Sequence, residues 1–113
     1  MTKVLILGTN GMLGHKLWQV LRHDFDTYAT VRHNFQTYAE YQLFDTEKLW
    51  TGIDASKFSS VTTALQATQP NVVINCIGII KQLPLAEDPI STIEINSLFP
   101  HRLAKICEVS GIR

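Results

Sequence analysis

The chain has 113 residues, of which 45% are hydrophobic, and its ten Lys and Arg side chains balance ten Asp and Glu side chains. This length allows one domain with a hydrophobic core and leaves no room for a second, substrate-binding domain. The balanced charge predicts no binding to nucleic acid or to an anionic membrane surface, and no apolar run reaches the length of a membrane span.

The first expected element is a strand over residues 3–7. This continuous apolar run ends at Gly8 and is typical of a strand buried on both faces of a parallel sheet. An amphipathic helix of about three turns is expected next, with an inward face at helical spacing. That face comprises Leu13, Leu17, Val20 and Leu21. Residues 27–31 are rich in Thr, Tyr and Val and predict a second strand, which completes a βαβ unit.

The second half of the chain repeats this alternation. Residues 32–52 carry aromatic side chains at no clean period, and we interpret most of them as packing. A short third strand is expected over residues 51–54, and a helix over residues 57–68 is expected to end at Pro70. Residues 72–77 are apolar and β-branched, so they predict a fourth strand of the same sheet.

A last helix is expected to begin near Pro89 and to end at Gly111. Pro100 removes one backbone hydrogen bond and predicts a kink. The expected inward face comprises Thr92, Ile95, Asn96, Phe99, Leu103, Ile106 and Cys107. Asn96 is its polar member and needs hydrogen-bond partners if buried. Residues 112–113 would begin another strand. The expected fold class is therefore α/β, a Rossmann-type parallel sheet with helices on both faces, truncated after about four strands.

The strongest functional signal is a G-x-x-G-x-x-G segment between the first strand and the first helix. Gly8 permits a tight turn, Gly11 lets the backbone approach a pyrophosphate, and Gly14 lets the helix and strand pack closely. The helix N-terminus adds free N–H groups and a partial positive charge. In this position the pattern predicts dinucleotide binding. The residues expected to contact the cofactor are Gly8, Asn10, Gly11, Met12, Leu13 and Gly14.

Cofactor choice depends on the residue at the end of the second strand. An acidic residue there would bind a ribose 2′-hydroxyl and favour NAD, but this chain has Arg32. A guanidinium can make a bidentate contact to a 2′-phosphate. The sequence therefore predicts NADP, with NAD as the alternative if Arg32 is only a solvated surface charge.

Three motifs together resemble the extended short-chain dehydrogenase/reductase superfamily, and within it the dTDP-4-dehydrorhamnose reductase group of sugar-nucleotide enzymes. They are Gly-Thr-Asn-Gly-Met-Leu-Gly at residues 8–14, Asn-Cys-Ile-Gly at residues 75–78 and Asn-Ser-Leu-Phe-Pro-His-Arg-Leu-Ala at residues 96–104. The resemblance implies a parent enzyme that reduces a 4-keto sugar on a nucleotide, using a nicotinamide cofactor.

The resemblance also implies roles for residues outside the glycine loop. Asp54 and Ala55 would lie beside the adenine, with the carboxylate accepting from the exocyclic amine; a simpler alternative is that Asp54 or Ser56 caps the next helix. The turn under the ribose and nicotinamide would consist of Cys76, Ile77 and Gly78. Asn96 would hold the active site through backbone hydrogen bonds. Lys81 would lie near the entering substrate, or be simply solvated.

Catalysis in this superfamily uses a Tyr-x-x-x-Lys pair with a Ser or Thr, and the chain contains no Tyr-x-x-x-Lys. Residues 1–113 are therefore expected to be the NAD(P)-binding, N-terminal part of a sugar-nucleotide oxidoreductase and to be inactive alone, with no catalytic residue of their own. Two alternatives stay open. One is a nucleotide-sugar epimerase or dehydratase of the same superfamily that uses bound NAD, and the other is a non-catalytic, cofactor-binding regulatory subunit.

The expected location is the cytoplasm, because the chain begins directly in an apolar strand without the longer apolar segment of a signal peptide. Cys76 and Cys107 lack metal-binding spacing, so no metal is predicted and both are expected to be buried free thiols. A fourth strand without a fifth beside it would leave a flat, uncharged sheet edge. A homodimer through that edge is therefore expected.

Overall fold

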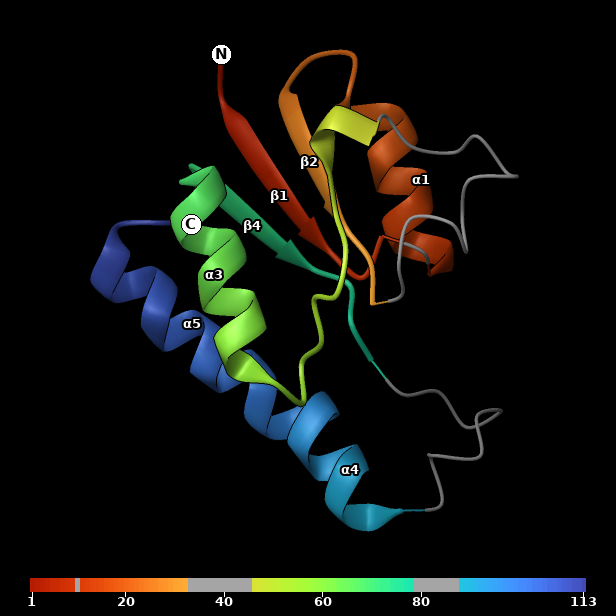
Figure 1. Ribbon diagram of the computed structural model, residues 1–113, viewed down its shortest axis with the longest axis vertical. Helices are drawn as coiled ribbons and strands as arrows, with labels where there is room; N and C mark the ends of the chain where they lie inside the picture. The colour runs from red at the N-terminus through yellow and green to blue at the C-terminus, as the bar shows by residue number, and fades with distance from the viewer. Residues whose placement is uncertain (10, 33–45, 79–87) are drawn as a thin grey trace.

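The computed structural model of the chain describes residues 1–9, 11–32, 46–78 and 88–113. They form a four-stranded sheet in the order β3-β2-β1-β4 with helices on both faces (Figure 1). The elements in chain order are β1 Lys3–Leu7, α1 Met12–Leu21, β2 Asp26–Thr30, the 3₁₀ helix η1 Thr46–Lys48, β3 Leu49–Trp50, α3 Phe58–Thr68, β4 Val72–Asn75, α4 Pro89–Ile93, the π-helical turn η3 Glu94–Leu98 and α5 Phe99–Ser110.

All the paired strands are parallel. On β1, Val4 is opposite Thr27 of β2 on one side and opposite Val72 of β4 on the other. The carboxyl ends of the strands therefore meet at one edge of the sheet. The expected fold class, a Rossmann-type α/β sheet, is confirmed.

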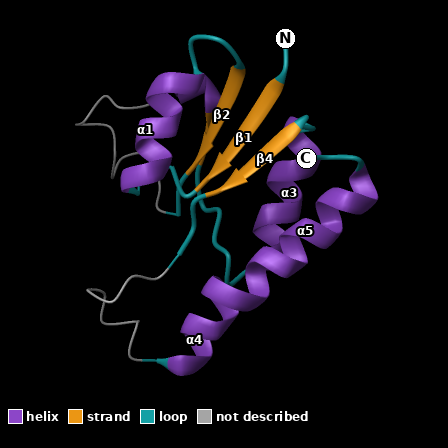
Figure 2. Ribbon diagram, turned by 180° about the vertical axis from the view of Figure 1, so that it is seen from behind, coloured by secondary structure: helices purple, strands orange, loops and turns teal. Residues whose placement is uncertain are grey.

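The central strand β1 is buried on both faces, as its continuous apolar sequence predicts. Leu5 and Leu7 point into a core shared with α3 and α5, whereas Val4 and Ile6 point into a second core closed by Trp18 of α1. Figure 2 shows α1 on one side of the sheet and the α3 and α5 layer on the other. Because side chains of β1 are packed in both cores, the strand cannot shift easily along its axis, and the position of its carboxyl end is fixed.

Helix α1 is rotated from the expected orientation, since Leu17 and Leu21 pack against the core as predicted but Leu13 and Val20 do not face it. Its buried residues are Gly14 and Trp18, whereas Leu13 and Val20 are 64% and 59% exposed. A Cβ on Gly14 would overlap the carbonyl oxygen of Gly8, so the glycine must face the strand. This close approach of backbones sets the rotation of α1, and it outweighs the burial of Leu13 and Val20.

Two strands differ from their expected ranges by more than one residue. The third strand is Leu49–Trp50, not residues 51–54, because Gly52 adopts a left-handed backbone (φ 70°) that turns the chain out of the extended conformation. The chain nevertheless stays beside β2, since the Ile53 N–H donates to the Val31 carbonyl at 3.2 Å. Strand β4 ends at Asn75, so residues 76–77 belong to the following turn. Helix α3 agrees with the expected range to within one residue.

The last helix contains a widened turn where a proline kink was expected. The Phe99 N–H donates to the Glu94 carbonyl five residues earlier, which is the π-helical pattern, and Pro100 follows in the first turn of α5. Because proline has no N–H to donate, a π turn placed before it accommodates the missing bond within a continuous helix. The expected inner positions Ile95, Phe99, Leu103 and Cys107 are buried.

Asn96 does not belong to the buried face, contrary to the expectation. It is exposed, and its Oδ1 lies 3.5 Å from the position that a Cβ on Gly78 would occupy. The side chain therefore faces the turn after β4 and not the core between α5 and the sheet.

The chain end lies against the outer edge of β4. Helix α5 ends at Gly111, whose φ of 71° is left-handed, as predicted for this glycine. The Arg113 N–H donates to the Asn71 carbonyl at 3.0 Å, and the Val73 N–H donates to the Arg113 carbonyl at 2.7 Å. This parallel pairing supports a strand beginning at residues 112–113. It also corrects the expectation of a bare β4 edge, since the start of that edge is already bonded.

Candidate functional site

The glycine loop lies where β1 leaves the sheet, beside the turn that follows β4. Gly8 has a φ of 77°, and a Cβ there would lie 3.0 Å from the Cys76 carbonyl carbon and from Cγ1 of Ile77. A side chain at this position would meet both backbone strain and the neighbouring turn. Gly8 is therefore required by the fold, and it brings the loop against residues 76–77.

Gly11 differs from its two neighbouring motif glycines because the fold does not require it. Its backbone is extended (φ −77°, ψ 170°) and it is exposed. Among the described residues, a Cβ at Gly11 would meet only the Gly8 carbonyl oxygen, at an ordinary 3.5 Å. As far as the described residues show, the space in front of Gly11 is therefore open, as approach of a ligand to the backbone needs.

Gly11 is also the N-cap of α1, and a glycine has no side chain to bond the free N–H groups of the first helical turn. The next two residues, Met12 and Leu13, are 94% and 64% exposed beside it. A helix N-terminus with uncapped N–H groups suits an anion such as a pyrophosphate. Of the residues expected to contact a cofactor, Asn10 lies outside the described residues.

Two buried threonines join the glycine loop to the end of β2. The hydroxyls of Thr9 and Thr30 both donate to the Ile6 carbonyl at 3.0 Å. The Thr30 N–H donates to the Thr9 hydroxyl oxygen at 3.0 Å, and the Thr9 N–H donates to the Thr30 carbonyl at 2.9 Å. The Gly8 N–H donates to the Thr30 hydroxyl oxygen at 3.3 Å. Neither threonine carries a signal in the sequence that predicts this pair.

Arg32 and Asp54, which are far apart in the sequence, interact electrostatically at the carboxyl end of β2. Partial burial acts to raise the pKa of the Asp54 carboxyl, but hydrogen bonds from Ser56 and the charges of Arg32 and Lys57 outweigh it, so the pKa lies below its usual value. Arg32 itself is exposed. The structure thus brings two of the predicted site residues to one place.

Asp54 does not cap α3, which was the simpler alternative for it. The N-cap is Lys57, without a side-chain cap. Instead, Oδ1 of Asp54 accepts from the Ser56 N–H at 2.9 Å and from the Ser56 hydroxyl at 2.8 Å. The backbone N–H of Asp54 donates to the Ser60 hydroxyl oxygen at 2.9 Å. These bonds fix a tight turn with Asp54 partly exposed and its neighbour Ala55 buried.

The turn after β4 faces Gly8 from the other side. The Asn75 side-chain oxygen accepts from the Ile77 N–H at 3.0 Å, which closes the turn. Cys76 packs against the α1 core, Ile77 packs against the opposite core, and Gly78 is exposed. Burial raises the pKa of the Cys76 thiol, as it does for Cys107, so packing and not reactivity is the role that the structure supports. Lys81 lies outside the described residues.

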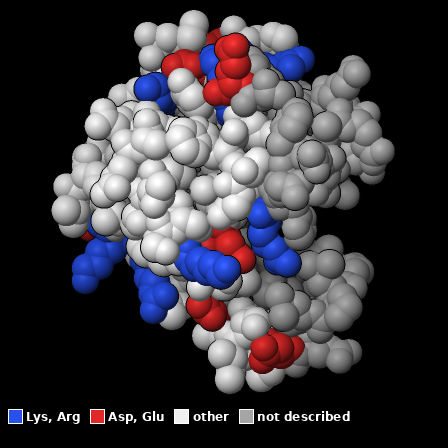
Figure 3. All heavy atoms as spheres, in the orientation of Figure 1, with Lys and Arg blue, Asp and Glu red and all other residues white. Residues whose placement is uncertain are grey.

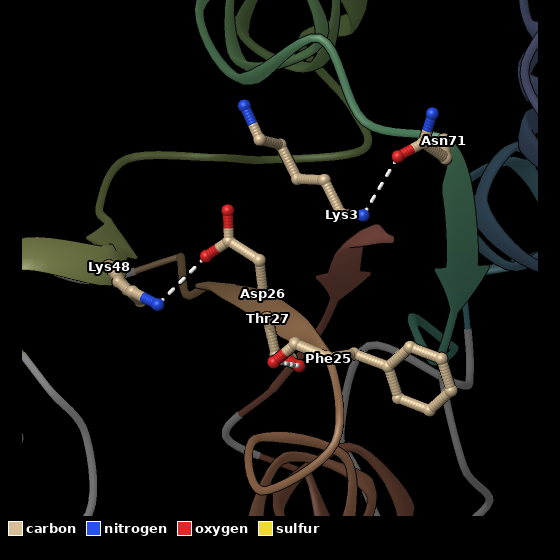
Figure 4. A network of polar contacts seen from close by, with 6 residues as sticks. All are labelled: Lys3, Phe25, Asp26, Thr27, Lys48 and Asn71. Atoms are coloured by element: carbon tan, nitrogen blue, oxygen red, sulfur yellow. Dashed lines mark hydrogen bonds and ion pairs between the residues drawn. The ribbon is translucent and has the colours of Figure 1, made fainter. Parts of the chain in front are cut away.

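A separate polar network holds the opposite, amino-terminal end of the sheet (Figure 4). Lys48 pairs with Asp26 at 2.8 Å, and the Lys3 N–H donates to the Asn71 side-chain oxygen at 2.8 Å. The ammonium groups of Lys3 and Lys48 lie 5.6 and 5.7 Å from the ring centre of Tyr28. A groove lined by Gln66, Gln69, Ser110 and neighbouring residues of α3 and α5 also opens at this end. Neither feature takes part in the candidate site.

Charged side chains of both signs are interspersed on the face shown in Figure 3, without a large patch of one sign.

Within the described ranges, no helix is long and apolar enough to cross a membrane. In the same part of the chain, no group of three or more His, Cys, Asp and Glu side chains could hold a metal ion. At the carboxyl edge of the sheet, the backbone N–H groups at the start of α1 suit an anionic group of a ligand. Arg32 and Asp54 lie at the same edge and could contact another part of that ligand.

The family model described as the RmlD substrate binding domain matches residues 1–113. The chain belongs to this family. The resemblance to the dTDP-4-dehydrorhamnose reductase group is therefore confirmed. A search of the curated proteins found no match.

Solved structures of related enzymes share the fold. dTDP-4-dehydrorhamnose reductase from Bacillus anthracis, in complex with NADP, matches 100% of this chain with a TM-score of 0.70 and 23% identity. UDP-glucose 4-epimerase from Thermus thermophilus, in complex with NAD, matches 99% with a TM-score of 0.77 and 18% identity. L-threonine 3-dehydrogenase from Trypanosoma brucei matches 100% with a TM-score of 0.80 and 18% identity. The chain spans 35% of the length of each of these proteins.

Proposed function

We propose that residues 1–113 are the NAD(P)-binding part of a sugar-nucleotide oxidoreductase. The observation that carries this proposal is Gly11, a glycine that the described fold does not need, placed at a helix N-terminus without a side-chain cap and, among the described residues, with open space in front of it. Gly11 and the first turn of α1 would hold the pyrophosphate, beside the exposed Met12 and Leu13. Asp54 would contact the adenine with its carboxylate, and the backbone of Ala55, whose side chain is buried, would lie beside it. Residues 76–78 would lie under the ribose and nicotinamide.

The proposed reaction of the whole enzyme is reduction of a 4-keto group on a nucleotide sugar. The bound dinucleotide would supply the hydride, and the residues of this chain would bind and orient it. Since the sequence contains no Tyr-x-x-x-Lys, we expect no turnover by residues 1–113 alone. The family membership and the likeness to the B. anthracis reductase support this assignment. We propose the cytoplasm as the location.

The proposed role of Arg32 is tested by comparing the affinities of the chain for NADPH and for NADH. We expect NADPH to bind more tightly than NADH because the guanidinium pairs with the 2′-phosphate. A hydrogen bond to a charged group contributes about 1.5–3 kcal/mol, so Arg32→Ala should weaken NADPH binding by about 10- to 150-fold and leave NADH nearly unchanged. Calorimetric titration of both cofactors measures the two affinities.

Arg22→Ala is the matched control, since Arg22 is also exposed but lies at the opposite end of α1. It should change neither affinity. Arg32→Ala should in addition raise the pKa of Asp54, because the positive charge that helps to lower it is gone. An Arg32→Ala variant with the wild-type preference for NADPH would refute the assignment of the 2′-phosphate to Arg32.

An epimerase or dehydratase that keeps its NAD bound is the second candidate, and the high structural similarity to the T. thermophilus epimerase favours it. The two candidates differ in how the cofactor exchanges. A reductase must release its oxidised cofactor, whereas an epimerase retains NAD through the reaction. Nucleotide extracted from the purified chain and identified by mass spectrometry would separate them, because retained NAD supports the second candidate.

Self-association through the β4 edge is a further part of the proposal. The Arg113 backbone bonds Asn71 and Val73, and among the described residues no further strand pairs with the later part of this edge strand, Ile74–Asn75. Pairing of two copies there would form a two-fold dimer with a continuous sheet. Light scattering after size exclusion should give twice the 12.7 kDa chain mass at micromolar concentration. A strictly monomeric protein would contradict the dimer.

A further inference from the structure

We infer that Thr9 and Thr30 form a positioning pair that fixes the distance between the glycine loop and the end of β2, so that one dinucleotide reaches both the loop and Arg32. This inference rests on the proposed dinucleotide binding. It assigns no contact with the cofactor to either threonine, since both are buried, with exposed fractions of 0% and 1%.

The pair is bonded in both directions. Thr9 donates its backbone N–H to the Thr30 carbonyl, and Thr30 donates its backbone N–H to the Thr9 hydroxyl oxygen. Both hydroxyls then donate to the same acceptor, the Ile6 carbonyl at the end of β1. Because each hydroxyl donates one bond and accepts another, neither threonine can shift without breaking bonds of the other.

The position of the pair gives it a role beyond the strand pairing itself. The regular pairing of β1 with β2 reaches Ile6 and Ala29. Just beyond it, Leu7 still pairs with β4 and Thr30 with β3, and the threonine pair joins the two backbones there. Thr9 leads directly to the Gly11 N-cap, and Thr30 leads to Arg32 two residues later. The pair therefore connects the glycine loop, which would bind the pyrophosphate, to the end of β2, where Arg32 would bind the 2′-phosphate of the adenosine ribose.

A dinucleotide makes this distance important, because covalent bonds fix the separation between its pyrophosphate and the 2′ position of its adenosine ribose. A ligand with fixed geometry gains most affinity from a site already held in the matching geometry. If the loop and the end of β2 moved independently, contact at one segment would be lost when the other was made. NADPH, which uses both segments, should therefore depend on the pair more than NADH does.

Thr27 offers a matched control on the same strand. It is 1% exposed, like Thr30, but its hydroxyl donates to the nearby Phe25 carbonyl at 3.1 Å at the amino end of β2 (Figure 4). Replacing either threonine with valine removes one buried hydroxyl and keeps the shape of the side chain. Only Thr30→Val removes hydrogen bonds at the loop, namely the bond that the Thr30 hydroxyl accepts from the Gly8 N–H and the bond that it donates to the Ile6 carbonyl. The two bonds between Thr9 and the Thr30 backbone remain.

The test uses the 113-residue chain with Thr30→Val, Thr30→Ser and Thr27→Val, titrated calorimetrically with NADPH and with NADH, and melted by circular dichroism. We expect Thr30→Val to weaken NADPH binding by about tenfold and to lower the preference for NADPH over NADH, as loss of a preorganised geometry predicts. Thr30→Ser, which keeps the hydroxyl, should restore most of the affinity. Thr27→Val should melt earlier with both affinities unchanged.

Each outcome decides a separate question. If the wild-type chain binds neither cofactor, the proposed function fails and the inference fails with it. If the wild type binds and folded Thr30→Val binds equally well, the inference alone is overturned. Equal losses of affinity in Thr30→Val and Thr27→Val would show a general loss of stability and also overturn it.

A second pair of variants covers the case in which Thr30→Val does not fold. Thr9→Val removes the bond from the Thr30 N–H to the Thr9 hydroxyl and the bond from that hydroxyl to the Ile6 carbonyl, whereas Thr9→Ser keeps both. These variants should reproduce the loss and the rescue. Failure of both valine variants to fold, under conditions where Thr27→Val folds, would assign the threonine pair to folding alone and overturn the positioning role.

Discussion

Gly11→Val is expected to abolish dinucleotide binding by the chain while leaving its fold intact. The extended backbone of Gly11 suits any residue, and a Cβ there meets only the Gly8 carbonyl oxygen, at 3.5 Å, among the described residues. Valine is a poorer N-cap than glycine, which costs about 1 kcal/mol of stability. The branched side chain would instead occupy the open space through which the pyrophosphate reaches the backbone.

Gly14→Ala, in the same motif, is expected to destabilise the fold and not to remove the binding site directly. Its Cβ would overlap the Gly8 carbonyl oxygen and lie 2.9 Å from the Thr9 Cα, and backbone atoms cannot turn aside as a flexible side chain does. Overpacking of this kind costs about 1–3 kcal/mol or more, whereas the better helix propensity of alanine returns at most about 1 kcal/mol. We therefore expect Gly14→Ala to lower the melting temperature clearly.

Circular dichroism melting and calorimetric titration with NADPH separate the two effects. Gly11→Val should melt close to the wild type and show no heat of binding. Gly14→Ala should melt early, and any folded fraction should still bind. Wild-type affinity in folded Gly11→Val would remove the glycine loop from the proposed site, and a wild-type melting curve for Gly14→Ala would refute the close packing of α1 on the loop.

The sequence predicts the parts of this fold where one periodicity is strong. Strand β1 is buried on both faces and reads as an unbroken apolar run, and α3 has its buried residues Val61 and Leu65 at a spacing of four. Strand β3 was misplaced because it has two residues, too few for any pattern, and because Gly52 ends it through a left-handed backbone. The observed strand order, β3-β2-β1-β4, is that of the Rossmann-type parallel sheet that the sequence predicts.

The candidate site was predicted where its residues are adjacent in the sequence and missed where they are not. The glycine loop and Arg32 carry local signals, and the structure places Asp54 close enough to Arg32 for their charges to interact. The Thr9 and Thr30 pair carries no such signal, because it exists only through the register of β1 against β2. Asn96 was expected to be buried from its spacing alone, but its side chain faces Gly78 at the edge of the sheet.

The rotation of α1 could have been found from the sequence. The third glycine of the motif marks the position at which the helix approaches the strand, and the residue four positions later lies on the same face. That residue is Trp18, which is 1% exposed, whereas counting apolar residues placed Val20 on the inward face. A close backbone contact is thus a stronger guide to helix orientation than the number of leucines and valines.

Trp18→Ala is expected to destabilise the chain severely, and Val20→Ala to change its stability little. Trp18 closes the core formed by Val4, Ile6 and Ala29, and truncation of a buried tryptophan costs about 3–5 kcal/mol. A domain of this size has a total stability of roughly 5–15 kcal/mol, so much of it would be lost. Val20 is 59% exposed, and substitution at such a site stays within about 0.5 kcal/mol. Urea unfolding followed by far-UV circular dichroism measures both.

The same variant connects the core to the proposed site, because Trp18 holds the helix whose N-terminus would bind the pyrophosphate. A ligand that binds only the folded state at 100 times its Kd stabilises that state by about 2.7 kcal/mol. NADPH should therefore restore much of the stability that Trp18→Ala loses, while the same concentration should not stabilise Gly11→Val. Equal destabilisation by Trp18→Ala and Val20→Ala would refute the observed rotation of α1. Failure of NADPH to stabilise even the wild-type chain would instead count against the proposed binding site.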